Sequence, residues 1–286
     1  MARNIVYIGS SAFGLECLLN SPHFAVDEVL CLAKRLTPPL ETLARTNRIV
    51  LTTFSGIADF RALVERNGAS MPFFIYQLDM LVPADLTERY AFFNVHRGNL
   101  QTNRGPNPDV WPILNGSPHT SLSLHKINEN VDSGALIDAF EVPIAVDDDT
   151  LTVRAKLEKG LPDLIISLHH YLEGSRAATP LVGGIYRPWI KEADFTIDLS
   201  VDSLDAIGRK IRSQRQYNGA ILLLDGKKYY VVDILEATPC RPGQDACFFA
   251  DAGIIRTCSN THTLVLQWNE HPKHPPPPIR PPSKRV

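Results

Sequence analysis

Short apolar runs alternate with longer amphipathic stretches through the first half of the chain. Four mostly apolar runs are each followed by a stretch with helical spacing, and these runs lie at 3–10, 26–33, 48–54 and 72–78. A fifth run, Ala91–His96, follows the last of these stretches. Such alternation is typical of βαβ units, whose strands form a mostly parallel sheet. We therefore expect an α/β domain with helices on both faces of its sheet.

The pattern changes in the second half of the chain. Residues 149–173 carry aliphatic side chains at near-helical spacing, which predicts a long helix that is kinked or broken at Pro162. Residues 176–188 are rich in Gly, Pro and small residues, as expected of a linker. Between 189 and 268, one helical stretch precedes several short strand-like runs. This arrangement predicts a small β-rich domain of the OB-like type.

The sequence thus divides into four parts. These are a Rossmann-like α/β domain, a linker, a small β-rich domain and a tail, at 1–175, 176–188, 189–268 and 269–286. The chain has 286 residues, of which 44% are hydrophobic, enough to fill two cores. The tail is rich in proline and basic residues, so we expect it to be disordered.

Composition narrows the class of protein. The 29 basic residues are offset by 31 acidic ones, and the net charge of -2 disfavours a nucleic-acid partner. The five cysteines lack paired spacing, so neither a disulfide framework nor a metal site is predicted. No window has the length of a membrane span, and the first residues lack a signal-peptide core. We expect a cytoplasmic protein without a membrane partner, and the sequence does not indicate its oligomeric state.

Polar side chains stand where the fifth apolar run ends. Asn94 and His96 lie two positions apart in this run, and Asp132 follows a strand-like run at 120–127. Ligands of open parallel sheets bind beyond the carboxyl ends of the strands. A histidine that removes a proton, a carboxylate that orients it and an amide that donates to an oxyanion would suit acyl transfer. A turn asparagine beside a partly buried structural histidine would leave the same pattern.

Three short motifs around these residues resemble those of a known family. They are Asn94-Val95-His96, Arg104-Gly105 and Asp132-Ser133-Gly134. The pattern resembles the 10-formyltetrahydrofolate-dependent formyltransferases, which include methionyl-tRNA formyltransferases and small-molecule N-formyltransferases. The resemblance implies that Asn94 stabilises an oxyanion, that His96 is the general base and that Asp132 orients His96. It also implies 10-formyltetrahydrofolate as the co-substrate, with no metal.

A second segment resembles the part of the family that precedes the catalytic strand. Residues 80–86, MLVPADL, are similar to the family's Leu-x-Pro segment. The resemblance therefore places the co-substrate against this segment and against the Asp-Ser-Gly turn. The residues that we expect to contact the co-substrate are Met80, Leu81, Val82, Pro83, Asp132 and Gly134. Residues 197–213 also resemble the start of the carboxyl-terminal domain in two-domain members.

The segment after His96 departs from the family. Members usually have Ser-Leu-Leu-Pro where this chain has Gly98-Asn99-Leu100-Gln101. Polar side chains in this region suit a concave pocket for a small amine. The residues predicted to bind the acceptor are Asn99, Gln101, Asn103, Arg104 and His125. His125 stands where sugar-modifying members often carry a histidine, although structural packing explains it equally well.

We interpret the chain as an N-formyltransferase that acts on the amine of a small molecule, such as an amino sugar nucleotide or a siderophore or other natural-product precursor. Methionyl-tRNA members carry a basic insertion after the second strand, whereas the same region here is short and offers Lys34, Arg35 and Arg45. The main alternative is a methionyl-tRNA formyltransferase, because those enzymes share the two-domain layout. A 10-formyltetrahydrofolate hydrolase and a non-catalytic folate-binding protein are further alternatives.

Overall fold

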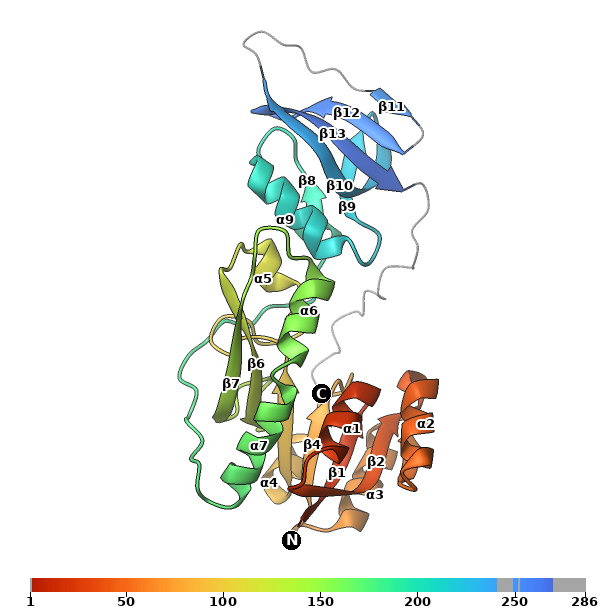
Figure 1. Cartoon of the computed structure of the whole chain (residues 1–286), viewed down its shortest axis with the longest axis vertical. Coiled ribbons are helices and arrows are strands. Elements are labelled where there is room, and N and C mark those ends of the chain that lie inside the picture. The colour runs from red at the N-terminus through yellow and green to blue at the C-terminus, as the bar shows by residue number, and fades with distance from the viewer. Residues whose placement is uncertain (1, 241–248, 252, 270–286) are drawn as a thin grey trace. The chain divides into compact units, whose positions relative to one another are not determined.

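The computed structural model describes residues 2–240, 249–251 and 253–269 (Figure 1). Its contacts divide the chain into two compact units. The first, the α/β unit, comprises the described residues up to Gly105 together with Ser121–Glu141 and Lys156–Tyr186. The second, the β-rich unit, comprises Pro106–Thr120, Val142–Ala155 and the described residues from Arg187 onward. Each unit therefore combines segments that are distant in the sequence.

A seven-stranded sheet is the centre of the α/β unit, in the order β3-β2-β1-β4-β5-β6-β7. Its strands are β1 (Arg3–Gly9), β2 (Phe24–Leu32), β3 (Val50–Phe54), β4 (Pro72–Tyr76), β5 (Ala91–His96), β6 (His119–Lys126) and β7 (Leu136–Pro143). β1 pairs in parallel with β2 and β4, β2 with β3, and β4 with β5. β6 runs antiparallel to β5. The mostly parallel sheet expected from the sequence is confirmed, whereas β7 was not anticipated.

Helices cover both faces of this sheet (Figure 1). They are α1 (Ala12–Leu19), the 3-10 helix η1 (Ala33–Arg35), α2 (Pro38–Thr46), α3 (Ile57–Asn67), α4 (Ala84–Arg89) and α7 (Leu161–Leu172). A further helix, α6 (Thr150–Glu158), begins among the residues of the β-rich unit and ends among those of the α/β unit. Val6 and Ile8 of β1 belong to the same buried cluster as Phe60 of α3. Tyr7 points to the opposite face, because side chains alternate along a strand, and there it lies against Gly14 of α1. The apolar runs are therefore buried on both sides.

The long helix expected over 149–173 is divided into α6 and α7. Pro162 lies in the first turn of α7, where its missing N–H leaves no hydrogen bond unmade. Gly160 precedes this turn and lies against the ring of Phe140 in β7, so a larger side chain would collide there. The sequence predicts a kink or break at Pro162, and the structure contains a break at 159–160, just before the turn that includes Pro162.

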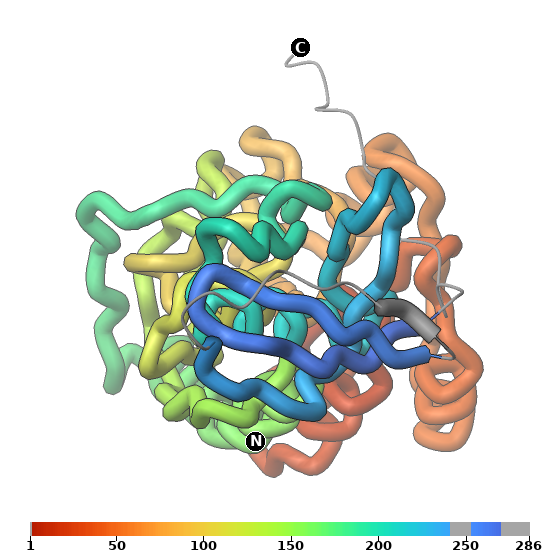
Figure 2. The backbone as a smooth tube through the Cα atoms, turned by 90° about the horizontal axis from the view of Figure 1, so that it is seen from above, coloured from red at the N-terminus to blue at the C-terminus, as the bar shows by residue number. Residues whose placement is uncertain are grey.

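The β-rich unit is built on a second sheet of six strands, in the order β11-β12-β13-β10-β9-β8. Its elements are α5 (Trp111–Leu114), α8 (Glu192–Phe195), β8 (Thr196–Ile197), α9 (Leu204–Gln214), β9 (Ala220–Leu224), β10 (Lys227–Pro239), β11 (Phe249–Asp251), β12 (Ile254–Cys258) and β13 (His262–Asn269). β10 and β13 run antiparallel, side by side (Figure 2). Ile207 and Ile211 of α9 share a core with Val231 of β10 and Leu266 of β13. The expected second, β-rich part is confirmed, and residues 270–286 of the predicted tail lie outside the described residues.

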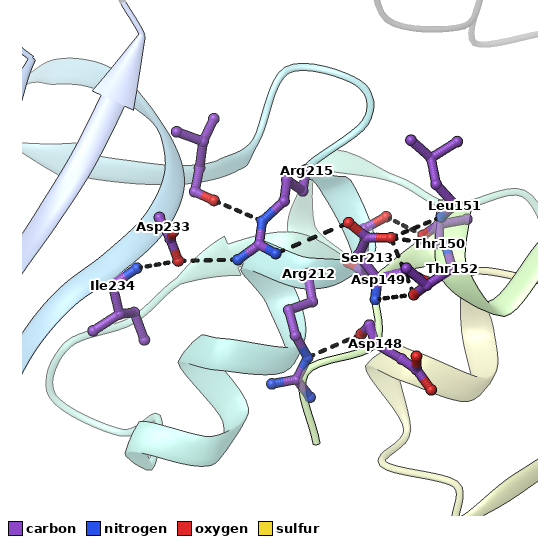
Figure 3. Close-up of polar contacts among 11 residues, drawn as sticks. Asp148, Asp149, Thr150, Leu151, Thr152, Arg212, Ser213, Arg215, Asp233 and Ile234 are labelled. Atoms are coloured by element: carbon purple, nitrogen blue, oxygen red, sulfur yellow. Dashed lines mark hydrogen bonds and ion pairs between the residues drawn. The ribbon is translucent and has the colours of Figure 1, made fainter. Parts of the chain in front are cut away.

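Carboxylates before α6 are tied into the β-rich unit (Figure 3). Asp148 is buried, and its main-chain carbonyl accepts a hydrogen bond from Arg212 at 3.2 Å. The Asp149 side chain accepts from two N–H groups in the first turn of α6, at 3.0 Å each, as an N-cap residue does. Arg215 lies 3.9 Å from Asp149. Arg215 therefore offsets the charge of Asp149, while Arg212 binds the backbone beside it.

Candidate active site

β5 and β6 bring three of the predicted side chains to one place. Asn94 and His96 alternate with Val95, so both point to the same face of the sheet. In the antiparallel register of the two strands, Asn94 is paired with His125. His96 and His125 are 7% and 1% exposed. The site is thus built on two paired strands and is shielded from bulk water.

The turn after β6 supplies Asp132. The chain leaves β6 at Lys126, whose N–H donates to the carbonyl of Ala135 at 3.0 Å as the turn closes. Asp132 has a φ of +47°, in the left-handed region that aspartate tolerates better than most residues. Its Oδ2 lies 3.5 Å from His96 Nδ1, and its Oδ1 lies 3.6 Å from His125 Nε2. One carboxylate therefore faces both imidazoles.

The loop after β5 holds His96 and Asp132 through two backbone groups. His96 Nε2 lies 2.8 Å from the carbonyl oxygen of Asn103. Because a carbonyl oxygen can only accept, Nε2 carries the hydrogen of this bond. The N–H of Gly105 donates to Asp132 Oδ2 at 3.0 Å. In this arrangement, Nδ1 of His96 faces the carboxylate while Nε2 is engaged by the backbone.

His125 fixes the side chain of Asn94. Its Nδ1 lies 3.1 Å from the carbonyl oxygen of Lys126 and must donate to it. Burial is the main cause that lowers the pKa of His125 from 6.5 to about 4, against the opposing effect of Asp132, so the ring is neutral near pH 7. Nε2 then carries a lone pair, which accepts from Asn94 Nδ2 at 3.1 Å. The second N–H of the Asn94 amide can donate to a ligand oxygen.

The sequence is similar to methionyl-tRNA formyltransferases. The enzyme from Burkholderia multivorans is 29% identical over 199 residues, which make up 66% of this chain and 60% of that protein. The enzyme from Limosilactobacillus fermentum is 31% identical over 163 residues, or 54% of this chain and 51% of that protein. The chain therefore spans about half to three fifths of the length of these relatives. No protein-family model matches the chain.

The fold is shared with a solved N-formyltransferase. That structure, from Helicobacter canadensis in complex with folinic acid and dTDP-3-aminofucose, matches with a TM-score of 0.68 over 94% of this chain and 100% of its own. The two sequences are 17% identical, so this likeness shows the fold alone. The related sequences, the shared fold and the three motifs agree. This chain is a formyltransferase homologue.

The segment before α4 of this formyltransferase homologue is partly buried. Met80 and Val82 pack against the same core cluster as Ile127, which follows β6. Leu81, by contrast, is 68% exposed, and Pro83 immediately precedes α4. The predicted co-substrate segment and the residue that follows β6 thus pack against one core. Contact of these residues with a co-substrate stays a prediction.

A cavity of about 290 Å³ lies between α4 and the Asp132 turn. The residues that line it are Thr87, Glu88, Lys126, Ile127, Asn128, Glu129, Gly134 and Ala135. Gly134 is thus the one predicted co-substrate residue in its wall, and Met80–Pro83 do not contribute. Its lining combines the polar side chains of Thr87, Glu88, Lys126, Asn128 and Glu129 with the apolar side chains of Ile127 and Ala135.

Residues predicted to bind the acceptor organise the loop in which they lie. The side chain of Asn99 accepts from the N–H of Gln101 at 2.8 Å. Asn103 contributes the carbonyl that contacts His96, and Arg104 Nη2 donates to the carbonyl of Gly184 at 2.6 Å. The structure therefore shows a loop-building contact for each of these four residues. Their contact with an acceptor stays a prediction.

Two contributors to the site escaped prediction from the sequence. The N–H of Gly105 holds Asp132, and Gly184–Tyr186 of the expected linker pair with the loop at Arg104. Gly105 could have been found, because it belongs to the Arg104-Gly105 motif. The linker residues could not, because they act through backbone hydrogen bonds, which leave no motif in a sequence.

Metal ligands or membrane-spanning helices would indicate other kinds of function. Among the residues that the structure describes, no group of three or more His, Cys, Asp or Glu side chains is arranged to hold a metal ion. None of the helices in the described ranges is long and apolar enough to cross a membrane. The cytoplasmic location expected from the sequence stays a prediction.

The neutral state of His125 predicts a loss of stability in acid. Between pH 6.5 and about 4, the unfolded chain protonates this imidazole while the folded protein keeps it neutral, so protons favour unfolding. The free energy of unfolding should therefore fall by roughly 2 kcal/mol between about pH 7 and pH 4.5 from this group. Urea denaturation at the two pH values measures the fall. His125→Gln should remove this part of it, and an identical fall in that variant would contradict a neutral His125.

Proposed function

We propose that this chain transfers the formyl group of 10-formyltetrahydrofolate to the amine of a small molecule. The observation that supports this most is the convergence of Asn94, His96 and Asp132 at the end of β5, with His125 behind Asn94. Together they offer the amide donor, the proton acceptor and the orienting carboxylate that formyl transfer requires. The related formyltransferase sequences support the same reaction.

The proposed reaction assigns one task to each side chain. As the amine nitrogen attacks the formyl carbon, a C–N bond forms and the formyl oxygen gains negative charge. Asn94 donates to that oxygen, with its amide held in place by His125. His96 takes the proton that the amine loses. It then gives this proton to N10 of the co-substrate as the bond between N10 and the formyl carbon breaks. Asp132 stabilises the imidazolium in the interval.

The residues present fit the proposed co-substrate. When bound, 10-formyltetrahydrofolate supplies the formyl group. Its pterin ring is flat and carries several hydrogen-bond donors and acceptors, for which the polar wall of the cavity beside Gly134 offers partners. We assign this ring to the cavity between α4 and the Asp132 turn, where the residues around Gly134 would hold it.

Ion pairing within the β-rich unit favours a small acceptor over a tRNA. Basic residues in and just after α9 already have acidic partners: Lys210 pairs with Asp202 at 2.6 Å, Arg215 with Asp233 at 2.9 Å, and Arg209 with Asp205. A tRNA-binding surface needs cations that can neutralise phosphates, and pairs of this kind compete with such contacts. A small amine needs a concave pocket with a few polar groups.

The connection between β2 and α2 points to the same kind of acceptor. β2 ends at Leu32 and α2 begins at Pro38, with the short helix η1 between them. This connection contains Lys34 and Arg35, and Arg35 forms an ion pair with Asp79. A basic insertion that could reach a tRNA is therefore missing from this part of the α/β unit.

The curated relatives favour a second candidate acceptor. Both relatives named above are methionyl-tRNA formyltransferases, so methionyl initiator tRNA is the alternative to a small amine. The solved N-formyltransferase from Helicobacter canadensis, by contrast, holds the amino sugar nucleotide dTDP-3-aminofucose. The charges of this chain decide our choice in favour of the small amine.

Direct assay of acceptors tests the proposal. With 10-formyltetrahydrofolate, the purified protein should formylate at least one amine of a panel that includes dTDP-3-aminofucose and hydroxyornithine. We expect kcat/KM for that amine to exceed the value for methionyl initiator tRNA by about tenfold or more, because binding contacts set such discrimination. Mass spectrometry of the formamide and the release of tetrahydrofolate measure the reaction.

Parallel reactions distinguish the alternatives. Efficient formylation of methionyl initiator tRNA would show that the acceptor is the tRNA and not a small amine. Formate released at the same rate with and without any amine would identify a hydrolase. A protein that binds the co-substrate but releases neither product would be a folate-binding protein without catalysis.

A further inference from the structure

Residues Gly184–Tyr186, here called the strap, pair with the segment Arg97–Gly105, here called the His96 loop. The N–H of Ile185 donates to the Gln101 carbonyl at 2.9 Å, and the N–H of Arg104 donates to the Ile185 carbonyl at 3.0 Å. Arg104 and Tyr186 form a parallel bridge. Figure 1 shows the chain after α7 running back along β7 before it reaches this position. The strap is therefore joined to the catalytic loop by backbone hydrogen bonds and an isolated β-bridge.

Arg104 adds a side-chain contact to this pairing. Its Nη2 donates to the carbonyl of Gly184 at 2.6 Å. Gly184 has a φ of +103°, a conformation that side chains other than glycine's strain to adopt. A methyl group built on it would lie 2.9 Å from both Arg104 Nη2 and the carbonyl oxygen of Leu100. Glycine is thus the residue that lets the strap lie this close to the loop.

The two neighbours of Arg104 hold the catalytic pair. Asn103 presents its carbonyl to His96 Nε2 at 2.8 Å, and Gly105 presents its N–H to Asp132 Oδ2 at 3.0 Å. Because Arg104 is held through both its backbone and its side chain, the strap fixes the backbone on either side of it. The strap therefore acts on His96 and Asp132 without touching either of them.

In this arrangement, His96 presents no nitrogen lone pair that an amine could reach. Nε2 points its hydrogen at Asn103, and Nδ1 faces Asp132. A general base needs an unprotonated nitrogen within hydrogen-bond reach of the group that it deprotonates. The His96 loop must therefore withdraw the Asn103 carbonyl before the proposed proton transfer can occur.

We infer that Arg104 and the strap form a latch that holds the His96 loop in a resting position, and that the acceptor amine releases it. Arg104 and Gly184 are positioning residues in this scheme, because they act through Asn103. The release by an amine rests on the proposed function. The latch itself can be tested in the free protein, without any substrate.

Chemical labelling of histidine tests the latch. Diethyl pyrocarbonate acylates an imidazole at an unprotonated nitrogen that it can reach, so the resting position should protect His96. Arg104→Gln and Gly184→Ala should each raise the labelling rate of His96 by about tenfold, the population change expected from the loss of a strong hydrogen bond. Mass spectrometry of peptides gives the rate at each histidine.

Gly183→Ala is the matched control. Gly183 also has a positive φ, of +72°, but among the described residues nothing lies within 4 Å of an added methyl group. Alanine at Gly183 thus also meets a positive φ while the contact with Arg104 is kept, and the labelling rate of His96 should stay near that of the unmodified chain. An equal rise in Gly183→Ala, or no rise in Arg104→Gln and Gly184→Ala, overturns the latch.

Two other histidines separate local release from unfolding. His119 is exposed and should react at one rate in all variants. His125 is 1% exposed and hydrogen-bonded through both ring nitrogens, so it should stay slow unless the α/β unit unfolds. A rise at His125 that parallels the rise at His96 would show unfolding in place of release and would also overturn the latch.

Kinetics then connect the latch with formyl transfer. Gly184→Ala weakens the latch but keeps the side chain of Arg104, which is predicted to bind the acceptor. It should lower the KM for the acceptor found in the amine panel several-fold, because the resting state competes with the amine, and should leave the KM for 10-formyltetrahydrofolate unchanged. An unchanged KM for the amine overturns release by the acceptor. Faster labelling of His96 in a protein that formylates no amine would uphold the latch and reject the proposed function.

Discussion

Replacing His96 by alanine should lower the turnover of formyl transfer by about a hundredfold or more, since a positioned general base contributes a factor of that order. Asp132→Ala should have a comparable effect, because its carboxylate lies 3.5 Å from His96 Nδ1 and orients the ring. Asn94→Ala removes a donor to the oxyanion and should raise the barrier by roughly 3 kcal/mol. Turnover at saturating concentrations of both substrates measures each effect.

His119→Ala is the control for these variants. His119 is exposed at the start of β6 and has no place in the site, so its removal should leave turnover unchanged. Thermal unfolding followed by circular dichroism establishes that each variant is folded. Near-normal turnover in folded variants at Asn94, His96 and Asp132 would show that the reaction takes place elsewhere.

Gly134→Ala should destabilise the α/β unit and remove most of its activity. A methyl group on Gly134 would overlap the carbonyl oxygen of Lys126, where the turn that carries Asp132 closes. Because this turn must open to admit the methyl group, we expect a loss of about 3 kcal/mol in the free energy of unfolding. Asp132 would move away from His96, and turnover should fall by about a hundredfold. Urea denaturation and steady-state kinetics measure the two effects.

Gly56→Ala provides the comparison. Gly56 precedes α3, and within the described part of the chain no atom lies within 4 Å of a methyl group built on it. The free energy of unfolding should change by less than about 1 kcal/mol, and turnover should not change. Equal destabilisation by the two substitutions would mean that the loss of glycine itself, rather than the overlap with Lys126, is responsible.

The strand of the site could be predicted from the sequence, but the contacts around it could not. The run Ala91–His96 is apolar up to its polar end, as β5 requires, and the spacing of Asn94 and His96 places both on one face. The position of Asp132 beside them followed from a family motif. The engagement of His96 by Asn103 depends on a backbone carbonyl, for which any residue would serve, so no pattern in the sequence marks it.

The division into units also depends on contacts that composition does not record. β7 escaped prediction because polar residues such as Asp138 and Glu141 interrupt its apolar positions. Residues 142–155 belong to the β-rich unit although they lie far from its sheet in sequence. The hydroxyl of Thr150, for example, donates to the carbonyl of Ser213 at 2.9 Å. A hydrogen bond between residues this distant follows from the tertiary fold, whereas composition reports only local preference.

The pairing of the strap with the His96 loop sets where this chain can be recombined with a relative. Composition changes at about residue 175, but a crossover there would give the His96 loop a strap of foreign sequence. A crossover after Tyr186 keeps every strap hydrogen bond described above within one parent. The segment that must come from one parent to keep the active site intact therefore extends to Tyr186. Chimaeras joined upstream of Gly184 exchange part of the active-site framework together with the second domain.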